Sequence, residues 1–407
     1  MDFDPLQLGA VLLAAVLVPV WARRRFAVPT RSARPWLGVT ALVAVSVAAW
    51  LVLTVASEDG FLVAVLLLPV VLLLVALRFF RWNAQAGRPV PAGRLVFGNL
   101  LVLAVPVTLA FAAGELWFRF VRDTTDSIGY TKVARRWLER HYRFNKTGFR
   151  DDIDYELRPA DGSRRVSFVG DSFTAGHGIA DVGRRCANLL RGRHPDWEVH
   201  VLAQNGNDTQ QEVELLRLVT GHGYVLDEVV LVYCLNDVMA LLPDGQATMQ
   251  AAGRQAEGRL KVFDSSYLLD TLYYRLAIAR LPGVGDYFSF IGEAYRGQPW
   301  EHQQARLRAL RAVVEQAGGR LSVVTWPFLH ALGPDYAHAW IHAQLAAFWQ
   351  DQGVAQLDLL PYLRGHAPAE LVVNSADAHP NERASELAAA AIEPWLLGVL
   401  NTPKPKR

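Results

Sequence analysis

The chain has 407 residues and a formal net charge of +2 at pH 7, with 41 Lys and Arg against 39 Asp and Glu. A balance this close to zero leaves no electrostatic argument for a nucleic-acid partner, and we expect none. The mean hydropathy is positive, +0.14, and the apolar residues are concentrated in the first third of the chain. The length can hold one large domain or two moderate ones, and the composition indicates a membrane region followed by a soluble part.

Four apolar segments precede residue 120, and each is about as long as a helix needs to cross a membrane. They are Leu6–Ala22, Pro35–Ser57, Phe61–Ala76 and Leu95–Gly114. One such segment alone could be a buried helix of a soluble protein, but four in succession predict an all-α bundle of four transmembrane helices over residues 1–120. A secretory signal peptide is not expected, because Asp2 and Asp4 replace the usual positive charge and no small-residue cleavage site follows.

The charges in the loops orient this bundle. Arginines fill the first loop and surround the third: Arg23, Arg24, Arg25, Arg31 and Arg34, then Arg78, Arg81, Arg88 and Arg94. The second loop carries only Glu58 and Asp59. By the positive-inside rule the first and third loops are cytoplasmic. We therefore expect a multi-pass protein of the cytoplasmic membrane, in contact with its lipid, with the N-terminus and everything after the fourth segment on the extracytoplasmic side.

Strands alternate with helices in the soluble part. Residues 121–160 are mixed, with a helical patch at 131–141, and predict a stalk; residues 161–400 carry the alternation. The strands are expected at Val166–Val169, Glu198–Ala203, Glu228–Tyr233, Leu321–Thr325 and Ala355–Leu359. This order predicts an α/β domain with a mostly parallel five-stranded sheet, right-handed crossovers and helices on both faces. Cys186 and Cys234 fall within the apolar patterns and are interpreted as small core residues, with a buried disulfide as the alternative.

Polar clusters follow the first three predicted strands. They are Gly170-Asp171-Ser172, the run 204–208 around Gly206, and the run 234–237 around Asn236. Ser172 alone could simply cap a helix, because serine is a favoured N-cap residue. The carboxyl ends of parallel strands share one edge of a sheet, however, and open α/β sheets place their ligands there. The topology therefore predicts one crevice that contains all three clusters.

A fourth cluster, at 375–381, contains Asp377 and His379 before an alanine-rich helix. A histidine held in a loop by Pro380, with an aspartate two residues upstream, suits a general base and its orienting carboxylate. An ordinary helix start is the alternative. Serine is a weak nucleophile unless such a base lies within hydrogen-bond reach, so the two clusters together predict a Ser–His–Asp triad.

Other histidines compete for these roles. His177 lies five residues after Ser172 and is a rival base, although no carboxylate partner is expected beside it. His338 and His342 are spaced i, i+4 and could share a metal ion on one helix face. The glutamate of the H-E-x-x-H signature is absent, so packing or surface histidines are the preferred interpretation, and no metal or other cofactor is expected.

Residues 238–300 form an insertion between the third strand and the next helix. Within it, an apolar helix is predicted at Tyr267–Leu276. Packing against the domain is the favoured interpretation of such a stripe. A cap over an acyl pocket or a contact with the membrane surface is the alternative.

These blocks resemble the SGNH (GDSL-type) hydrolases. The match consists of Gly170-Asp171-Ser172, Gly206, Asn236-Asp237 and Asp377-x-His379-Pro380, in that order and over roughly residues 145–398. The run NKTGFRD at 145–151 is also similar to membrane-anchored members. The resemblance implies the SGNH fold, a flavodoxin-like three-layer sandwich.

The resemblance also implies roles for individual residues. Ser172 is the nucleophile, His379 the base and Asp377 its partner. The backbone N–H groups of Ser172 and Gly206, with the side-chain amide of Asn236, form the oxyanion hole that acyl transfer requires. Two features depart from the family pattern: Cys234 stands at the usual glycine position of the third block, and the Asp–His spacing is two rather than the commoner three, a variant the family also shows.

Three functions are consistent with this pattern. The first is an esterase that hydrolyses acyl esters, acetyl esters among them, of an envelope glycan or lipid. The second is an O-acyltransferase that passes the acyl group from Ser172 to a sugar hydroxyl. The third is a catalytically silent binding domain on a membrane anchor, against which the complete triad argues. Four helices exceed what anchoring needs, so a membrane-protein partner is a further expectation.

Overall fold

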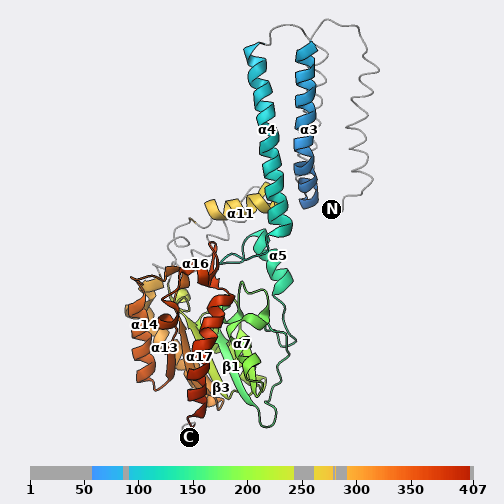
Figure 1. The fold of residues 1–407 in the computed structure, drawn as a ribbon. Helices are drawn as coiled ribbons and strands as arrows, with labels where there is room; N and C mark the ends of the chain where they lie inside the picture. The colour runs from blue at the N-terminus through green and yellow to red at the C-terminus, as the bar shows by residue number, and fades with distance from the viewer. Residues whose placement is uncertain (1–56, 86–90, 243–260, 278–279, 281–290, 404–407) are drawn as a thin grey trace. The chain divides into compact units, whose positions relative to one another are not determined.

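The computed structural model describes residues 57–85, 91–242, 261–277, 280 and 291–403. The described residues divide into two compact units. The first comprises those up to Trp117 together with 261–269, and the second comprises the others from Phe118 on. Figure 1 shows the long helices of the first unit and the sheet of the second.

The first unit contains two long apolar helices. α3 spans Glu58–Gln85 and α4 spans Ala92–Leu116, and α4 runs on into a π-helical turn at Trp117–Val121. Both are long and apolar enough to cross a membrane, over Glu58–Ala84 and Ala92–Val121, and only 28% and 17% of their most apolar windows is buried. They contain the third and fourth predicted segments. The first two, Leu6–Ala22 and Pro35–Ser57, lie outside the described residues except for Ser57.

Two short helices of the predicted insertion follow much later in the chain. α10 spans Lys261–Ser265 and α11 spans Tyr267–Leu276, where the apolar helix was predicted. Within the first unit, the Glu115 carboxylate accepts hydrogen bonds from Ser266 Oγ at 2.7 Å and from the N–H groups of residues 267 and 268 at 3.1 Å each. A carboxylate at a helix N-terminus satisfies N–H groups that have no partner within the helix. The first unit ends at Leu269 in this part of the chain, so Tyr267–Leu269 of α11 belongs to the first unit and Asp270–Leu276 to the second.

The second unit is built on a five-stranded sheet. Its strands are β1 (Arg164–Gly170), β2 (Trp197–Ala203), β3 (Glu228–Cys234), β4 (Arg320–Trp326) and β5 (Ala355–Asp358). They are all parallel and lie in the order β2-β1-β3-β4-β5, which is the flavodoxin-like order of a doubly wound sheet. The predicted five-stranded parallel sheet is therefore confirmed, and each strand lies close to its predicted bounds.

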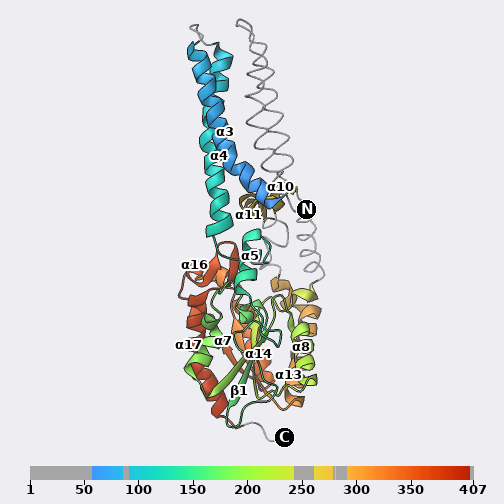
Figure 2. The ribbon, with the colours of Figure 1, turned by 90° about the vertical axis from the view of Figure 1, so that its right-hand side faces the viewer.

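Helices cover both faces of the sheet, which makes three layers. α7 (Cys186–Arg193) and α17 (Glu382–Asn401) pack together on one face, and α8 (Thr209–Gly221) and α13 (Gly297–Gln316) pack together on the other (Figure 2). All residues of the central strand β3 are buried, as expected for a strand covered on both sides. The remaining helices are α5 (Lys132–His141), α6 (Ser172–Ala175), α14 (Ala339–Asp351), α15 (Leu360–Leu363) and α16 (Pro368–Leu371), with 3-10 turns at Val182–Arg184, Met239–Leu241, Gly292–Tyr295 and Leu329–Ala331.

One local prediction near the fourth cluster was wrong. His379 lies on a strand and not in a loop: β7 (Asp377–Pro380) pairs antiparallel with β6 (Val372–Asn374) in a small hairpin. The segment is too short and too polar to show the alternation by which a strand is recognised in sequence. The strand pairing fixes the backbone on which Asp377 and His379 are carried.

Candidate active site

The turn that carries Ser172, the predicted nucleophile, is here named the nucleophile turn and begins where β1 ends. Asp171, not Ser172, caps α6: its Oδ1 accepts a hydrogen bond from the Phe173 N–H at 2.9 Å. The Ser172 hydroxyl is therefore not used as a helix cap. Gly170 is required at this bend, because a Cβ there would meet the Val232 carbonyl oxygen of β3 at 2.8 Å. The chain thus passes close to the central strand and presents Ser172 at the carboxyl edge of the sheet.

The structure brings Ser172, His379 and Asp377 together. Ser172 Oγ lies 2.7 Å from His379 Nε2, and His379 Nδ1 lies 2.6 Å from Asp377 Oδ1. Both distances are those of hydrogen bonds, and all three side chains are buried or nearly so. The network assigns the proton of the neutral imidazole to Nδ1, which donates to Asp377, so Nε2 is free to accept the serine proton. This arrangement can activate a serine hydroxyl.

The pKa shifts of Asp377 and His379 support the same assignment of the proton to His379 Nδ1. Burial acts to raise the pKa of Asp377, but the neighbouring His379 and the hydrogen bonds to the carboxylate outweigh it and lower the pKa to about 2. Burial acts to lower the pKa of His379, and the charge of Asp377 outweighs that effect and raises the pKa above its ordinary value. Asp377 is therefore ionised and stabilises an imidazolium at His379.

His177, the rival base, does have a carboxylate beside it. Its Nε2 lies 3.6 Å from Asp377 Oδ2, and burial and then the charge of His379 lower its pKa to about 4. The expectation that no carboxylate lies near His177 was wrong, because the β6–β7 hairpin brings Asp377 to it. Its two nitrogens contact other groups, however: Nε2 the Asp126 carbonyl oxygen at 3.0 Å, and Nδ1 the Asn205 amide at 2.9 Å. His177 is therefore a neutral structural link and a worse candidate for the base than His379.

The two other predicted oxyanion donors lie on separate loops. Asn236 Nδ2 donates to Asp171 Oδ2 at 3.3 Å, so the amide lies beside the nucleophile turn. Gly206 follows β2 with a φ of +82°, in the left-handed region that favours glycine, and no atom lies within 4 Å of the place a Cβ would take. The backbone at Gly206 is thus unobstructed on the side where other residues carry a side chain.

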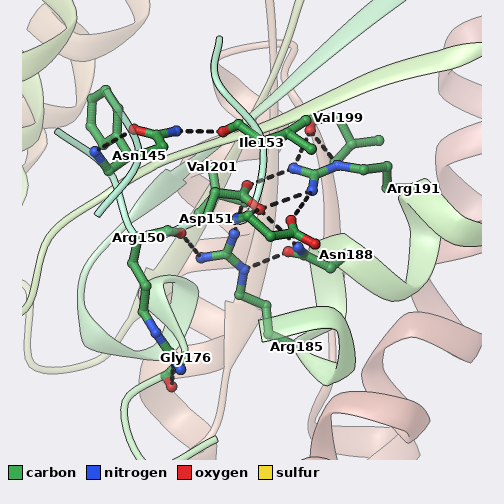
Figure 3. A network of polar contacts seen from close by, with 12 residues as sticks. Asn145, Arg150, Asp151, Ile153, Gly176, Arg185, Asn188, Arg191, Val199 and Val201 are labelled. Atoms are coloured by element: carbon green, nitrogen blue, oxygen red, sulfur yellow. Dashed lines mark hydrogen bonds and ion pairs between the residues drawn. The ribbon is translucent and has the colours of Figure 1, made fainter. Parts of the chain in front are cut away.

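A buried ion-pair network links residues 150 and 151 to α7 and β2 (Figure 3). Asp151 is its centre. Arg191 binds both carboxylate oxygens, with Nη1–Oδ1 at 2.9 Å and Nη2–Oδ2 at 2.6 Å, and Arg185 Nη2 lies 2.8 Å from Oδ2. Asn188 Nδ2 donates to Oδ1 at 3.1 Å, and the Tyr155 hydroxyl donates to Oδ2. Burial acts to raise the pKa of Asp151, but the arginines hold it well below its usual range.

Arg150 connects this network to Ser172. Its guanidinium donates to the carbonyl oxygens of Ala175, Gly176 and Ile179, at and just after the end of α6, and its own carbonyl oxygen accepts from Arg185 Nη1 at 2.8 Å. Burial, with the nearby charge of Arg185, lowers the pKa of Arg150 to about 10, so it stays charged. A cation at a helix C-terminus satisfies carbonyl groups that lack a partner in the helix. The run 145–151 thus supports the turn that carries the serine.

Replacing Asp151 with asparagine is expected to lower the free energy of unfolding by about 3–5 kcal/mol, because buried arginine charge is left without its counter-ion. Chemical denaturation of the purified protein measures this. Asp152→Asn is the matched control, since Asp152 pairs with the same Arg191 at 3.3 Å but its side chain is 61% exposed. An exposed pair contributes about 0–1 kcal/mol. Equal effects of the two substitutions would contradict this description of the network.

The other candidate sites have ordinary partners. His342 Nδ1 lies 2.8 Å from Asp358 Oδ1, and His338 lies just before α14. Among the described residues, the one group of three or more His, Cys, Asp or Glu side chains close enough for a single ion is His177, Asp377 and His379, whose ligand atoms lie within 4.8 Å of one another. These atoms are hydrogen-bonded as described above. Cys186 and Cys234 are free thiols, so the disulfide alternative is wrong.

Two parts of this site were missed at the sequence level. Thr125, whose hydroxyl donates to Asp377 Oδ2, lies in the stalk, and no motif or periodicity distinguishes it there. Arg150 and Asp151 lie in the run 145–151, which resembles membrane-anchored SGNH proteins but gave no role for either side chain. For Arg150 there was no direct signal in the sequence. A buried charge needs partners that the fold supplies, and these are seen only in the structure.

Comparison with known proteins gives similarity of structure only. No family model matches the chain, and no curated protein matches it in sequence. Among solved structures, the esterase EstA from Pseudoalteromonas sp. is 14% identical over 59% of this chain and 100% of its own, with a TM-score of 0.36. An extracellular lipase from Streptomyces rimosus is 17% identical over 58% and 99%, with a TM-score of 0.35. A lipolytic G-D-S-L family protein from Veillonella parvula is 14% identical over 59% and 100%, also with a TM-score of 0.35. Scores this low support no conclusion about activity or substrate, so the function is argued from the geometry.

Proposed function

We propose that this chain is a membrane-anchored serine esterase that hydrolyses small acyl esters. The observation that carries the proposal is the continuous hydrogen-bonded chain from Ser172 Oγ through His379 to the buried carboxylate of Asp377. A serine, an imidazole with the correct free nitrogen and an ionised partner are the three elements of nucleophilic acyl transfer. A domain that only bound a ligand would not need a serine, an imidazole and a carboxylate hydrogen-bonded in series. This argues against a catalytically silent binding domain.

The proposed reaction has two displacements. Ser172 Oγ attacks the acyl carbonyl carbon while His379 Nε2 takes its proton, and a tetrahedral oxyanion forms. As the ester C–O bond breaks, His379 returns the proton to the leaving alcohol and the acyl group remains on Ser172. Water then attacks this acyl-enzyme with His379 again as base, and the carboxylic acid leaves as the serine regains its proton.

Aromatic side chains around the serine favour a small acyl group such as acetyl. The Phe173 ring lies 5.4 Å from the His379 ring and 5.9 Å from that of Trp326, centroid to centroid. Ser172 and His379 are only 8% and 9% exposed. Little of the reacting groups is thus exposed, which favours a small acyl group over a long one. The proposed substrates are acetyl esters of an envelope glycan or lipid.

The membrane part of the proposal has separate support. α3 and α4 leave most of their apolar surface uncovered, which is costly in water and favourable in lipid. By the positive-inside rule, the arginines of the first and third loops favour an extracytoplasmic catalytic domain. We therefore infer a multi-pass anchor in the cytoplasmic membrane with the active site outside the cytoplasm.

Asn236 is proposed as a donor to the oxyanion, with the backbone N–H groups of Ser172 and Gly206. Replacing it with alanine is expected to lower kcat by about 10²–10³-fold, because one donor to the developing negative charge is lost. The KM should change little, since the charge forms only in the transition state. Steady-state hydrolysis of p-nitrophenyl acetate measures both. A change in KM alone would remove Asn236 from the oxyanion hole.

The test of the proposed function is covalent labelling of the detergent-solubilised full chain with a fluorophosphonate, which reacts only with an activated serine. Labelling is expected at Ser172, located by peptide mass spectrometry. Failure of the folded wild-type protein to react would overturn the esterase and the acyltransferase together. If labelling occurs, adding glycan acceptors to an acetyl-ester assay separates the two: release of acetate supports the esterase, and acetylated glycan supports the acyltransferase.

A further inference from the structure

Residues 122–131, here named the connecting segment, join the last apolar helix to the catalytic domain and contact the triad. The buried Thr125 Oγ1 donates a hydrogen bond to Asp377 Oδ2. The other oxygen, Oδ1, accepts from the ring Nδ1 of His379 at 2.6 Å and from its backbone N–H at 3.1 Å. Each oxygen of the carboxylate therefore has a donor of its own, and the donor to Oδ2, Thr125, comes from outside the Ser–His–Asp set.

The connecting segment is fixed on both sides of Asp377. The Ser127 N–H donates to the Ala376 carbonyl oxygen at 3.0 Å, and Ser127 Oγ accepts from the Ala378 N–H at 3.1 Å. Asn374 Nδ2 also donates to the Thr125 carbonyl oxygen at 2.9 Å. These bonds bind the segment to the β6–β7 hairpin immediately before and after the carboxylate. The position of Thr125 relative to Asp377 is thus set by several hydrogen bonds, each of which includes a backbone group, and not by one flexible side chain.

His177 is a further contact of the connecting segment. Its Nε2 lies 3.0 Å from the Asp126 carbonyl oxygen, which can only accept, so Nε2 carries the proton. Its Nδ1 then accepts from the Asn205 amide at 2.9 Å. Asn205 directly precedes Gly206, so one buried histidine links the connecting segment to the loop of a proposed oxyanion donor.

We propose that Thr125 is a positioning residue of the triad, so that the connecting segment is part of the active site. The proposal rests on the esterase function proposed above. A carboxylate held at both oxygens cannot rotate about its Cβ–Cγ bond, and Asp377 therefore keeps His379 aimed at Ser172. Only residues 122–124 separate Thr125 from Val121, the end of the apolar stretch, so the two Cα atoms lie within about 14 Å of each other however the chain bends. The segment that ends the membrane anchor thereby supplies a contact on which the triad geometry depends.

The test compares Thr125→Val and Thr125→Ser in the solubilised full chain. Valine keeps the shape and removes the hydroxyl, and serine restores it. We expect Thr125→Val to lower kcat for p-nitrophenyl acetate by about 10–100-fold with KM nearly unchanged, because misaligning a catalytic group affects the chemical step. Thr125→Ser should recover most of that loss.

Thr325→Val is the matched control. Thr325 lies on β4 and is also buried. Its Oγ1 accepts a hydrogen bond from Gln356 Nε2 at 2.7 Å. It should lower the melting temperature about as much as Thr125→Val does, since each loses one buried hydroxyl, yet leave kcat within about threefold of wild type. An equal loss of kcat in this control, or no rescue by serine, would assign Thr125 a merely structural role and overturn the inference.

The rate of fluorophosphonate labelling separates this inference from the function on which it rests. Slower labelling of Thr125→Val than of wild type supports it. Labelling of both at the same rate overturns the positioning role while leaving the esterase intact. A wild-type protein that is not labelled at all overturns both.

Discussion

Replacing Ser172 with alanine is expected to abolish fluorophosphonate labelling and to lower kcat for acetyl-ester hydrolysis by about 10⁴–10⁶-fold. The reason is that the substitution removes the atom that bonds to the acyl carbon, which is the hydroxyl oxygen hydrogen-bonded to His379 Nε2. Any hydrolysis by the variant above the uncatalysed rate in water would come from the oxyanion donors and substrate binding alone. Intact-protein mass spectrometry detects the label, and stopped assays with high enzyme concentration measure the residual rate.

Ser167→Ala provides the control for this substitution. Ser167 lies on β1, the strand that leads to Ser172, and is fully buried, and its Oγ lies 3.0 Å from the Tyr224 hydroxyl. It should retain full labelling, with only the modest stability loss of about 1 kcal/mol that follows from a missing hydrogen bond. If Ser172→Ala is still labelled, another residue is the nucleophile. If both variants lose labelling, the loss reflects unfolding around β1 and not the loss of the nucleophile.

The sheet was predictable because its strands are buried on both faces. β3 is apolar after Glu228, and β1 is apolar from Val166 to Val169 except for Ser167. Such largely apolar runs alternating with helices leave few topologies. Ser172 and Asn236 were predictable for the same reason, because a strand that ends at the carboxyl edge determines which loop lies at the crevice. Their hydrogen bonds to His379 and Asp171 follow from that placement.

Contacts made by segments without periodicity were not predictable. Thr125 lies far from Asp377 in sequence, in a stretch whose order comes from single hydrogen bonds to the β6–β7 hairpin. Neither residue type nor spacing specifies such a partner, because Thr has no unusual preference for the position. The same holds for the carboxylate near His177, since an isolated two-stranded hairpin forms only through tertiary packing.

Buried arginines show an intermediate case. Arg150 lies in a charged stretch before β1, and Arg185 and Arg191 lie in a second one after α6. Either stretch could equally form a solvated surface, and the number of arginines does not distinguish a buried stretch from an exposed one. In the structure Arg150 and Arg185 are almost fully buried, and each is satisfied by carbonyl or carboxylate oxygens. The requirement that buried charge be paired explains the network once it is seen, but it does not identify the partners beforehand.

Replacing Asp377 with asparagine is expected to lower kcat by about 10⁴-fold while leaving the fold intact. Asparagine has nearly the same shape, so it can keep the contacts of the β6–β7 hairpin. Its amide N–H would face His379 Nδ1, however, and that nitrogen would then have to accept. The single proton of the neutral ring would move to Nε2, which could no longer take the proton of Ser172.

The pH dependence of the same variant distinguishes this mechanism from a general loss of structure. In the wild type the charge of Asp377 counteracts burial and raises the pKa of His379, so activity should fall as the pH decreases through that raised value. Without the charge, burial dominates and the pKa of His379 falls, so the acidic limit of the residual activity should move to lower pH. Asp152→Asn, with its exposed carboxylate, should leave both kcat and this limit unchanged. Residual activity above about one tenth of wild type in Asp377→Asn would show that the carboxylate does not set the tautomer of His379.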